Sequence, residues 1–209
     1  LVSRALISFP ETAGYFPKGK TEITGLPVRD EFFRTPPKPP GGALDLLVTG
    51  GSQGSRTLNE AGRLSWPLFR QSGAAVRIVH QSGPRDYEKL RAEFAQSGLE
   101  GEVTPFIADM PAAFARADLV VCRSGAGAVS ELAAAGKPSV LSPFPFAADD
   151  HQTRNAEAME RAGAARLVRD GEMTGEKLFS IVSDLAGAPE TLAQMGAAAR
   201  KLARPGAAA

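Results

Sequence analysis

Short apolar runs, separated by longer segments of mixed polarity, make up most of this chain. The runs are rich in leucine and valine and about four to seven residues long, which is typical of buried strands. The segments between them carry apolar residues at helical spacing. We expect strands at residues 44–49, 75–81, 102–106, 119–122, 139–142 and 165–168, with helices between them and two more helices at the end. Short strands that alternate with helices predict an α/β fold, a parallel sheet with helices on both faces.

The ends of the chain do not follow this alternation. Residues 2–9 and 21–24 predict two more strands, with a helical turn at 10–16 between them. The stretch RTPPKPPGG, residues 34–42, contains four prolines and two glycines. It predicts an exposed linker, because proline is excluded from helix interiors and central strands. The Ala-rich residues 205–209 are predicted to be disordered, and the start at Leu1 rather than Met indicates a piece of a longer protein.

The loops after the strands are the candidate binding region, because ligands of open parallel sheets bind beyond the carboxyl ends of the strands. Small, polar and glycine residues crowd this edge in GGSQGS, HQSGPRD, IADM, RSGAGAVSE and PFPFAADDHQTRN. The first of these, residues 50–55, joins a strand to a helix, where free backbone N–H groups can bind a phosphate. Its spacing matches neither common nucleotide-binding glycine pattern, so a tight turn without a ligand explains it equally well.

A second glycine loop precedes the helix that contains Glu131. The segment CRSGAGAVSELAAAGKP repeats the order of strand, glycine loop and helix. Glu131 falls in the first two turns of this helix, where a carboxylate suits a ribose diol, but the helix dipole alone also favours an acidic residue there. Arg123 is a candidate partner for an anion or a base edge, or a side chain that points to water.

The segment PFPFAADDHQTRNAEAM opens another helix on the same edge. Asp149 or Asp150 is expected to cap this helix, and His151, Gln152 and Asn155 fall on its first turns. A metal site at the aspartates is the weaker interpretation, since no second histidine lies at ligand spacing. His80 and Ser82 suggest a catalytic triad but lack the G-x-S-x-G turn, and Cys122 is expected to be a buried core residue.

Composition narrows the classes of function. The 24 basic and 23 acidic residues give no reason to expect nucleic acid as a partner. One cysteine, Cys122, cannot form an internal disulfide, which indicates a reducing compartment and therefore the cytoplasm. No stretch of the sequence reaches the roughly 20 apolar residues of a membrane span.

Several of these motifs occur together and in order in a known family. GGSQGSRTLNE, HQSG, FIADM, CRSGAGAVSELAAAGKPSVLSPFPFAADDHQTRNA and the upstream SFPETAGYFPKGKTEITGLPVR resemble the C-terminal half of the MurG family. Members are UDP-N-acetylglucosamine:undecaprenyl-pyrophosphoryl-muramyl-pentapeptide N-acetylglucosaminyltransferases. The resemblance implies the Rossmann-like C-terminal domain of a GT-B glycosyltransferase. It assigns residues 43–204 to UDP-sugar donor binding and residues 1–33 to the trailing edge of the N-terminal acceptor domain and the interdomain segment.

The resemblance also implies roles for individual residues. Ser52 and its loop would approach the diphosphate, the Ile107 backbone the uracil, Glu131 the ribose and Gln152 the N-acetylglucosamine hydroxyls, with Arg29 as a further donor contact. Secondary contacts would be Gly51, Gln53, Gly54, Arg123, Ser124, Gly125, Ala126, Gly127, Ala128, His151 and Asn155. The family usually has bulkier residues at 127 and 128 and a glutamine at 151, which makes the sugar contacts less secure than the nucleotide contacts.

The function implied by the resemblance is an inverting transfer of N-acetylglucosamine from UDP-N-acetylglucosamine to lipid I, forming lipid II in peptidoglycan synthesis. No metal or other cofactor is expected. The catalytic base and the lipid contacts would lie in the N-terminal half, so this piece alone would be inactive. The full protein would be peripheral on the inner face of the plasma membrane and serve cell division and cell shape. The alternatives are a donor-binding subunit of a split glycosyltransferase, a related lipid glycosyltransferase, or a UDP-sugar 2-epimerase.

Overall fold

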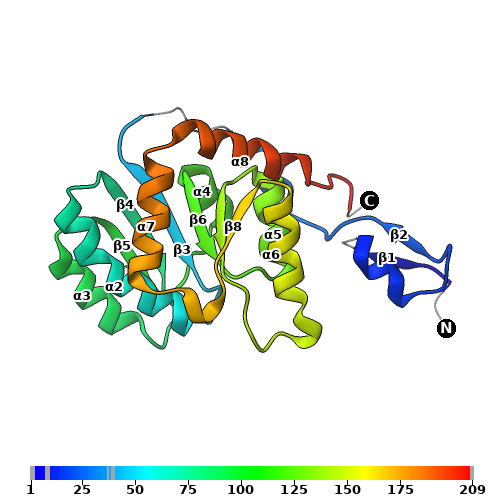
Figure 1. Cartoon of the computed structure of the whole chain (residues 1–209), viewed down its shortest axis with the longest axis horizontal. Helices are drawn as coiled ribbons and strands as arrows, with labels where there is room; N and C mark the ends of the chain where they lie inside the picture. The colour runs from blue at the N-terminus through cyan, green and yellow to red at the C-terminus, as the bar shows by residue number, and fades with distance from the viewer. Residues whose placement is uncertain (1–2, 8–9, 37, 39–40, 208–209) are drawn as a thin grey trace.

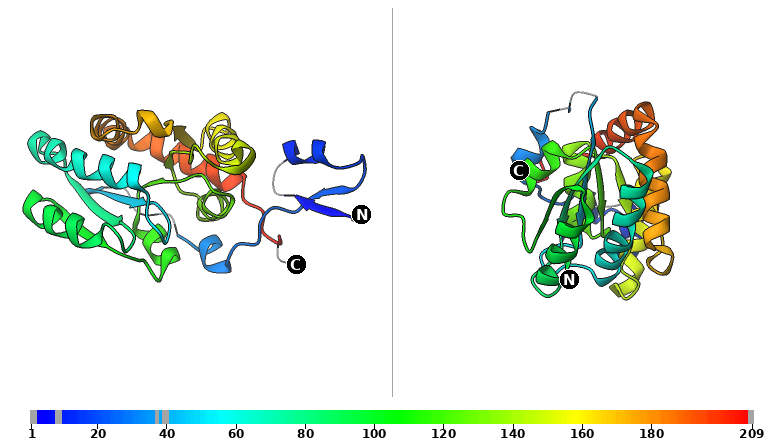
Figure 2. Two further views of the ribbon diagram at one scale, coloured as in Figure 1. Left: turned by 90° about the horizontal axis from the view of Figure 1, so that it is seen from below. Right: turned by 90° about the vertical axis from the view of Figure 1, so that its left-hand side faces the viewer.

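The computed structural model describes residues 3–7, 10–36, 38 and 41–207. Most of the chain forms one α/β domain, and a small N-terminal unit projects from it on the right of Figure 1. A view at right angles shows the same separation (Figure 2). The sequence predicted the large domain from its alternating pattern, and that prediction is confirmed.

Six parallel strands form the sheet of the large domain within the described residues, in the order β5-β4-β3-β6-β7-β8. Their bounds are Leu44–Thr49 for β3, Val76–Gln81 for β4, Glu100–Thr104 for β5, Leu119–Cys122 for β6, Ser139–Leu141 for β7 and Ala165–Leu167 for β8. The chain builds one half of the sheet outward from β3 and then returns to build the other half from β6. The two halves therefore meet between β3 and β6, the point where ligands bind in sheets of this order.

The third strand of this set lies earlier than expected. The prediction placed it at residues 102–106, whereas β5 begins at Glu100 and ends at Thr104. Gly101 has a φ of +127°, and a Cβ added there would lie 1.9 Å from the Ile78 carbonyl oxygen. Only glycine can pair that closely with β4, so a residue that suggested a turn lies inside the strand.

Helices cover both faces of the sheet. One layer consists of α2 (Arg56–Ser72), α3 (Tyr87–Ser97) and α7 (Gly175–Ala186); the other consists of α4 (Met110–Arg116), α5 (Ala126–Ala135) and α6 (His151–Arg161). Alternate residues of β3 face the two layers, with Leu46 and Val48 in one core and Leu47 in the other. The last helix, α8 (Pro189–Lys201), crosses the domain and contributes Met195 to the first core and Ala199 to the second. Among the described residues, no helix has the length and apolar character that a membrane span requires.

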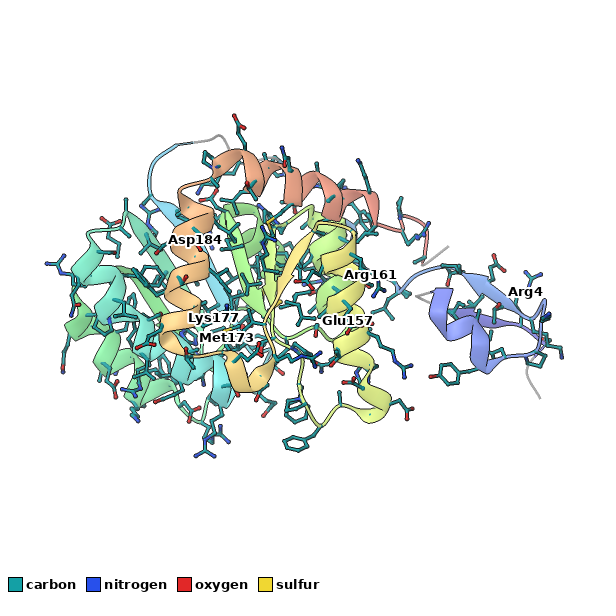
Figure 3. The ribbon with its side chains drawn as sticks, in the orientation of Figure 1. Arg4, Glu157, Arg161, Met173, Lys177 and Asp184 are labelled. Carbon is teal, nitrogen blue, oxygen red and sulfur yellow. The ribbon has the colours of Figure 1, made fainter. Side chains whose placement is uncertain are left out.

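The N-terminal unit is a parallel pair of strands, β1 (Ala5–Ile7) and β2 (Thr21–Ile23), joined through the 3-10 helix η1 (Pro10–Tyr15). The predicted first strand extended over residues 2–9, of which 2, 8 and 9 lie outside the described residues. Arg4 of this unit, labelled in Figure 3, donates to Glu22 at 2.8 Å. Both strands of the pair were predicted, but the sequence did not show that they are parallel.

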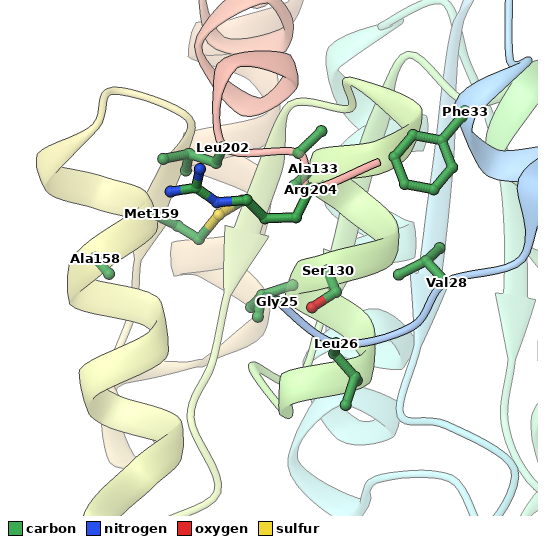
Figure 4. Close-up of a pocket in the computed structure, with 12 residues that line it drawn as sticks. Gly25, Leu26, Val28, Phe33, Ser130, Ala133, Ala158, Met159, Leu202 and Arg204 are labelled. Carbon is green, nitrogen blue, oxygen red and sulfur yellow. The ribbon is translucent and has the colours of Figure 1, made fainter. Parts of the chain in front are cut away.

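The segment around Leu26, which leads into the large domain, packs near residues 202–204 at the C-terminal end of the chain. A cavity of about 100 Å³ lies here, lined by Leu26, Val28, Met159 and Leu202 among others (Figure 4). Of residues 205–209, predicted to be disordered, 205–207 form a turn, and 208 and 209 lie outside the described residues. The predicted exposed linker is also wrong for Thr35, which is buried, and for Lys38, whose ammonium lies 2.5 Å from both Asp45 and Asp118.

The short helix α1 (Asp30–Phe33) follows the predicted interdomain segment and packs against the second core. Phe32 is fully buried and meets the Phe114 ring of α4 edge-on at 5.3 Å between centroids. The residue before this helix, Arg29, lies over the Phe32 ring at 5.3 Å. The packing of Phe32 therefore fixes the position at which Arg29 meets the large domain.

Candidate functional site

The candidate site lies at the carboxyl ends of β3 and β6, where the halves of the sheet meet. A glycine loop follows each of these strands and leads into a helix, α2 after β3 and α5 after β6. Both helix N-termini present backbone N–H groups at this edge, and helix N-termini attract anions. The two glycine loops singled out in the sequence are thus brought together.

The first loop, residues 50–55, is tightly built. The Gly54 N–H donates to the Gly51 carbonyl at 3.0 Å, and Ser55 caps α2 by accepting from the Leu58 N–H at 3.4 Å. A Cβ at Gly54 would lie 2.0 Å from the Ser82 carbonyl oxygen, so packing against the next loop requires this glycine. Turn geometry explains Gly54. Gly51 also has a positive φ, +80°, but it differs in its surroundings, because no atom lies within 4 Å of an added Cβ and the exposed Ser52 and Gln53 lie beside it.

Gln81 joins this loop to the predicted base-binding loop, and sequence reasoning missed it. Its buried side-chain amide donates to the Gly51 carbonyl at 2.7 Å and to the Thr49 hydroxyl at 3.2 Å. Its amide oxygen accepts from the Ile107 N–H at 2.8 Å. The Ile107 N–H is therefore engaged inside the protein, and its carbonyl is the backbone group that remains to bind a base. The position of Gln81 at the end of a predicted strand was the available signal.

The second glycine loop is held from behind by α6. Ser124 donates from its hydroxyl to the Gln152 carbonyl at 2.8 Å, and the Asn155 amide donates to the Ser124 carbonyl at 2.9 Å. Helix α5 then begins at Ala126 without a side-chain cap, and added Cβ atoms at Gly125 and Gly127 would meet nothing within 4 Å. Asn155 and Ser124 therefore position the loop, while the open space lies over the first residues of α5.

Glu131 of α5 and Arg29 are brought close enough to interact. Burial raises the pKa of the Glu131 carboxyl, and the positive charge of Arg29 partly offsets that rise. Arg29 immediately precedes α1 and lies far from Glu131 in the sequence. The two predicted donor contacts therefore lie within electrostatic range of each other.

Arg123 does not point to water. Its guanidinium Nη1 donates to Asp170 at 2.5 Å and to the Ser142 carbonyl at 3.1 Å, and the group lies 5.7 Å from the centre of the Phe144 ring. Asp170 also accepts from the Thr57 hydroxyl of α2 at 3.1 Å. The ion pair therefore joins the end of β6 to the first turn of α2, and Asp170 is a residue that sequence reasoning missed.

The start of α6 differs from the prediction. Asp149 and Asp150 both have positive φ, at 51° and 53°, and neither carboxylate caps the helix. The left-handed backbone turns the Asp150 carboxylate toward the Thr153 hydroxyl, which donates to it at 2.6 Å. Such conformations are strained for residues other than glycine and collect at functional sites. No group of three potential metal ligands occurs within the part of the chain that the structure describes.

Gln152 and His151 lie on the first turn of α6. Gln152 accepts through its amide oxygen from the Phe144 N–H at 3.0 Å, which leaves its amide nitrogen for the predicted sugar contact. The exposed His151 places Nδ1 2.7 Å from the Ala148 carbonyl. Phe144 and the exposed Phe146 stack edge-on at 5.6 Å in the preceding loop.

His80 belongs to a buried network behind the first loop and not to a triad. Its Nε2 lies 3.0 Å from the Asn59 amide oxygen, while the Ser82 hydroxyl donates to the Gly83 carbonyl. Burial lowers the pKa of His80 to about 4. Cys122 is buried, as predicted, and burial raises its thiol pKa to about 12. Neither side chain is placed to react with a ligand.

Acidification is expected to destabilise the fold through His80. The unfolded chain takes up a proton at a pKa near 6.5, whereas the folded chain resists protonation until about pH 4. Stability from this histidine is therefore lost as pH falls through that window, by up to about 3 kcal/mol. Urea unfolding at several pH values measures it. The chain has two histidines, and the exposed one, His151, supplies the control. The dependence of the unfolding free energy on pH should be unchanged in His151→Ala and weaker in His80→Gln. An equal pH dependence in all three proteins would contradict this prediction.

Comparisons with known proteins identify relatives of the chain. The profile described as glycosyltransferase family 28 C-terminal domain matches residues 45–209. Over 208 residues the chain is 72% identical to the UDP-N-acetylglucosamine–N-acetylmuramyl-(pentapeptide) pyrophosphoryl-undecaprenol N-acetylglucosamine transferase of Solibacter usitatus, covering 100% of this chain and 57% of that protein. The transferase of the same name from Sorangium cellulosum is 44% identical over 211 residues, 100% of this chain and 52% of that protein. The chain thus spans little more than half the length of these relatives.

Solved structures agree with the fold. The crystal structure of Acinetobacter baumannii MurG superposes with a TM-score of 0.82 at 35% identity, over 98% of this chain and 58% of that chain. A putative UDP-N-acetylglucosamine 2-epimerase from Listeria monocytogenes superposes with a TM-score of 0.67 at 18% identity, over 94% of this chain and 53% of that one, which shows a shared fold alone. The predicted fold class is confirmed.

Proposed function

We propose that this chain, which belongs to the family of glycosyltransferase family 28 C-terminal domains, is the donor-binding half of an inverting N-acetylglucosaminyltransferase. The donor would be UDP-N-acetylglucosamine. The observation that carries the proposal is the pair of glycine loops and helix N-termini, of α2 and α5, that meet between β3 and β6. Two helix N-termini at one point suit a diphosphate, whose negative charge increases as the sugar leaves.

The remaining contacts of the donor are proposed for residues around the two loops. Ser52 and Gln53 lie exposed beside the diphosphate position, and the Ile107 carbonyl suits the N3–H donor of a uracil. Glu131 suits the ribose diol, with Arg29 beside it. The Gln152 amide nitrogen suits a sugar hydroxyl, and the open N-terminus of α5 leaves space for that sugar.

The acceptor belongs to the same proposal. The names of the Solibacter and Sorangium relatives include N-acetylmuramyl-(pentapeptide) pyrophosphoryl-undecaprenol. We infer lipid I as the acceptor of the complete protein, with lipid II as product, a peripheral place on the inner face of the plasma membrane, and a role in cell division and cell shape. Acceptor binding is assigned to a second domain.

The test of the proposal is nucleotide binding by the 209-residue chain. Isothermal titration calorimetry in buffer with EDTA is expected to detect UDP and UDP-N-acetylglucosamine, with AMP much weaker, because the uracil and the diphosphate are both bound by backbone groups. Equal affinity for UDP and AMP, or binding that requires an added divalent ion, would contradict the donor-site assignment.

Glu131→Ala is expected to weaken UDP binding by about 1–3 kcal/mol, because the ribose would lose a charged hydrogen-bond acceptor. Calorimetry measures it, and circular dichroism checks the fold. Glu176 provides a matched control: it is exposed in the first turn of α7, where it complements only the helix dipole. Glu176→Ala should leave the UDP affinity unchanged. If the two variants bind UDP equally well, Glu131 serves the helix dipole instead.

A further inference from the structure

Gln81 is a buried side chain whose polar contacts reach two different loops. The residue is 1% exposed and ends β4, one position after the strand's histidine. Its amide nitrogen donates to the Gly51 carbonyl of the first glycine loop at 2.7 Å, and its amide oxygen accepts from the Ile107 N–H at 2.8 Å. The Thr49 hydroxyl accepts from both Gln81 and the Gly51 N–H. One side chain thus fixes both loops to the same strand end.

We propose that Gln81 is a positioning residue that sets the separation between the base-binding backbone at Ile107 and the phosphate-binding loop at Gly51. This inference rests on the proposed function, since it assigns the two loops to the base and the diphosphate of one nucleotide. Gln81 touches neither group. It makes the two loops a single site that selects a nucleoside diphosphate of one length.

The physical basis is the gain from binding two linked groups at once. When two subsites are held at the right separation, the second group of a ligand binds at a high effective concentration. If the separation varies, each subsite still binds its own group but the advantage of the linkage falls. Loss of Gln81 is therefore expected to weaken UDP, which spans both loops, far more than uridine, which occupies one.

The experiment compares UDP and uridine binding to the 209-residue chain and its Gln81→Met variant. Methionine keeps the length of the side chain and removes all three hydrogen bonds. UDP affinity, measured by calorimetry, should fall at least about tenfold, and uridine affinity, measured by ligand-observed NMR, should change less than about threefold. Ile78→Val is the matched control: Ile78 is buried in the same strand and contacts neither loop through a polar group. It should lower stability without changing either affinity.

Gln81→Glu provides a second, independent measurement. It tests whether Gln81 positions the two loops even if Gln81→Met does not fold. A protonated glutamic acid resembles glutamine, with one donor and one acceptor, whereas the ionised form has acceptors only and faces the Gly51 carbonyl. Burial raises the pKa of such a carboxyl. The ratio of variant to wild-type UDP affinity should therefore rise as pH falls from about 8 to about 5.5. His80, Asp109 and Glu131 are the same in both proteins, so the ratio isolates the effect of residue 81.

The outcomes separate this inference from the proposed function. If the wild-type chain does not bind UDP, the proposed function fails. If the wild-type chain binds UDP but Gln81→Met weakens UDP and uridine equally, or weakens neither, Gln81 is structural and the inference fails. A pH-independent ratio for Gln81→Glu overturns it as well.

Discussion

The 209-residue chain alone is expected to form no glycosyl-transfer product, whereas a fusion with the remaining part of the Solibacter relative is expected to regain transfer. The carboxyl edge of the sheet would supply the proposed nucleotide-binding groups, but transfer also requires an acceptor hydroxyl in contact with the sugar and a base to deprotonate it. Holding two reactants in such contact supplies roughly 7–11 kcal/mol of barrier reduction. One domain that binds one substrate cannot supply this contribution.

The measurement is product formation from labelled UDP-N-acetylglucosamine and a lipid I analogue, with the isolated chain and the fusion at equal concentration. The 72% identity to the Solibacter protein makes that protein the natural source of the second domain. A fusion carrying Glu131→Ala is the control and should be slower through weaker donor binding. Product from the isolated chain at the rate of the fusion would place the base within these residues, with His151 and Asp150 as the first to test.

The order of strands and helices was predictable because the central strands, such as β3 and β6, are largely apolar. Leu46, Leu47 and Val48 are all buried, since helices cover both faces of the sheet. The edge that carries the candidate site was predictable for the same reason, because parallel strands bring all their carboxyl ends together. The local errors arose where backbone conformation overrides composition. Gly101 lies inside a strand, and Asp149 and Asp150 adopt the left-handed conformation.

The connections between the loops were not predictable from sequence patterns. Arg123 pairs with Asp170, 47 positions away, and Gln81 binds the Ile107 N–H, 26 positions away. Nothing in the local spacing of these residues encodes their partners, because the contacts arise only when the sheet brings the loop ends together. The predicted loops gather at one edge of the sheet, and their residue roles stay predictions, while the side chains that hold the loops in place become visible only in three dimensions.

Gly54→Ala is expected to destabilise the chain by about 2–5 kcal/mol. Gly54 has a φ of +75°, which costs a residue with a side chain about 1–2 kcal/mol. A methyl group there would also lie 2.0 Å from the Ser82 carbonyl oxygen, a backbone atom that cannot move without displacing the neighbouring loop. Overpacking of that kind costs about 1–3 kcal/mol more. Urea unfolding of both proteins measures the difference.

Gly51→Ala separates the role of a turn from the role of a ligand contact within the same loop. Gly51 has a similar φ of +80° but nothing within 4 Å of an added Cβ, so this variant should lose only the conformational cost of about 1–2 kcal/mol. Its open surroundings are where a diphosphate would approach the backbone, and a methyl group there should weaken UDP binding in a protein that remains folded. Gly54 would thus be required for loop packing, and Gly51 for the approach of the diphosphate to the backbone. Equal losses of stability in the two variants would contradict the packing argument, and unchanged UDP affinity in Gly51→Ala would place the diphosphate away from this loop.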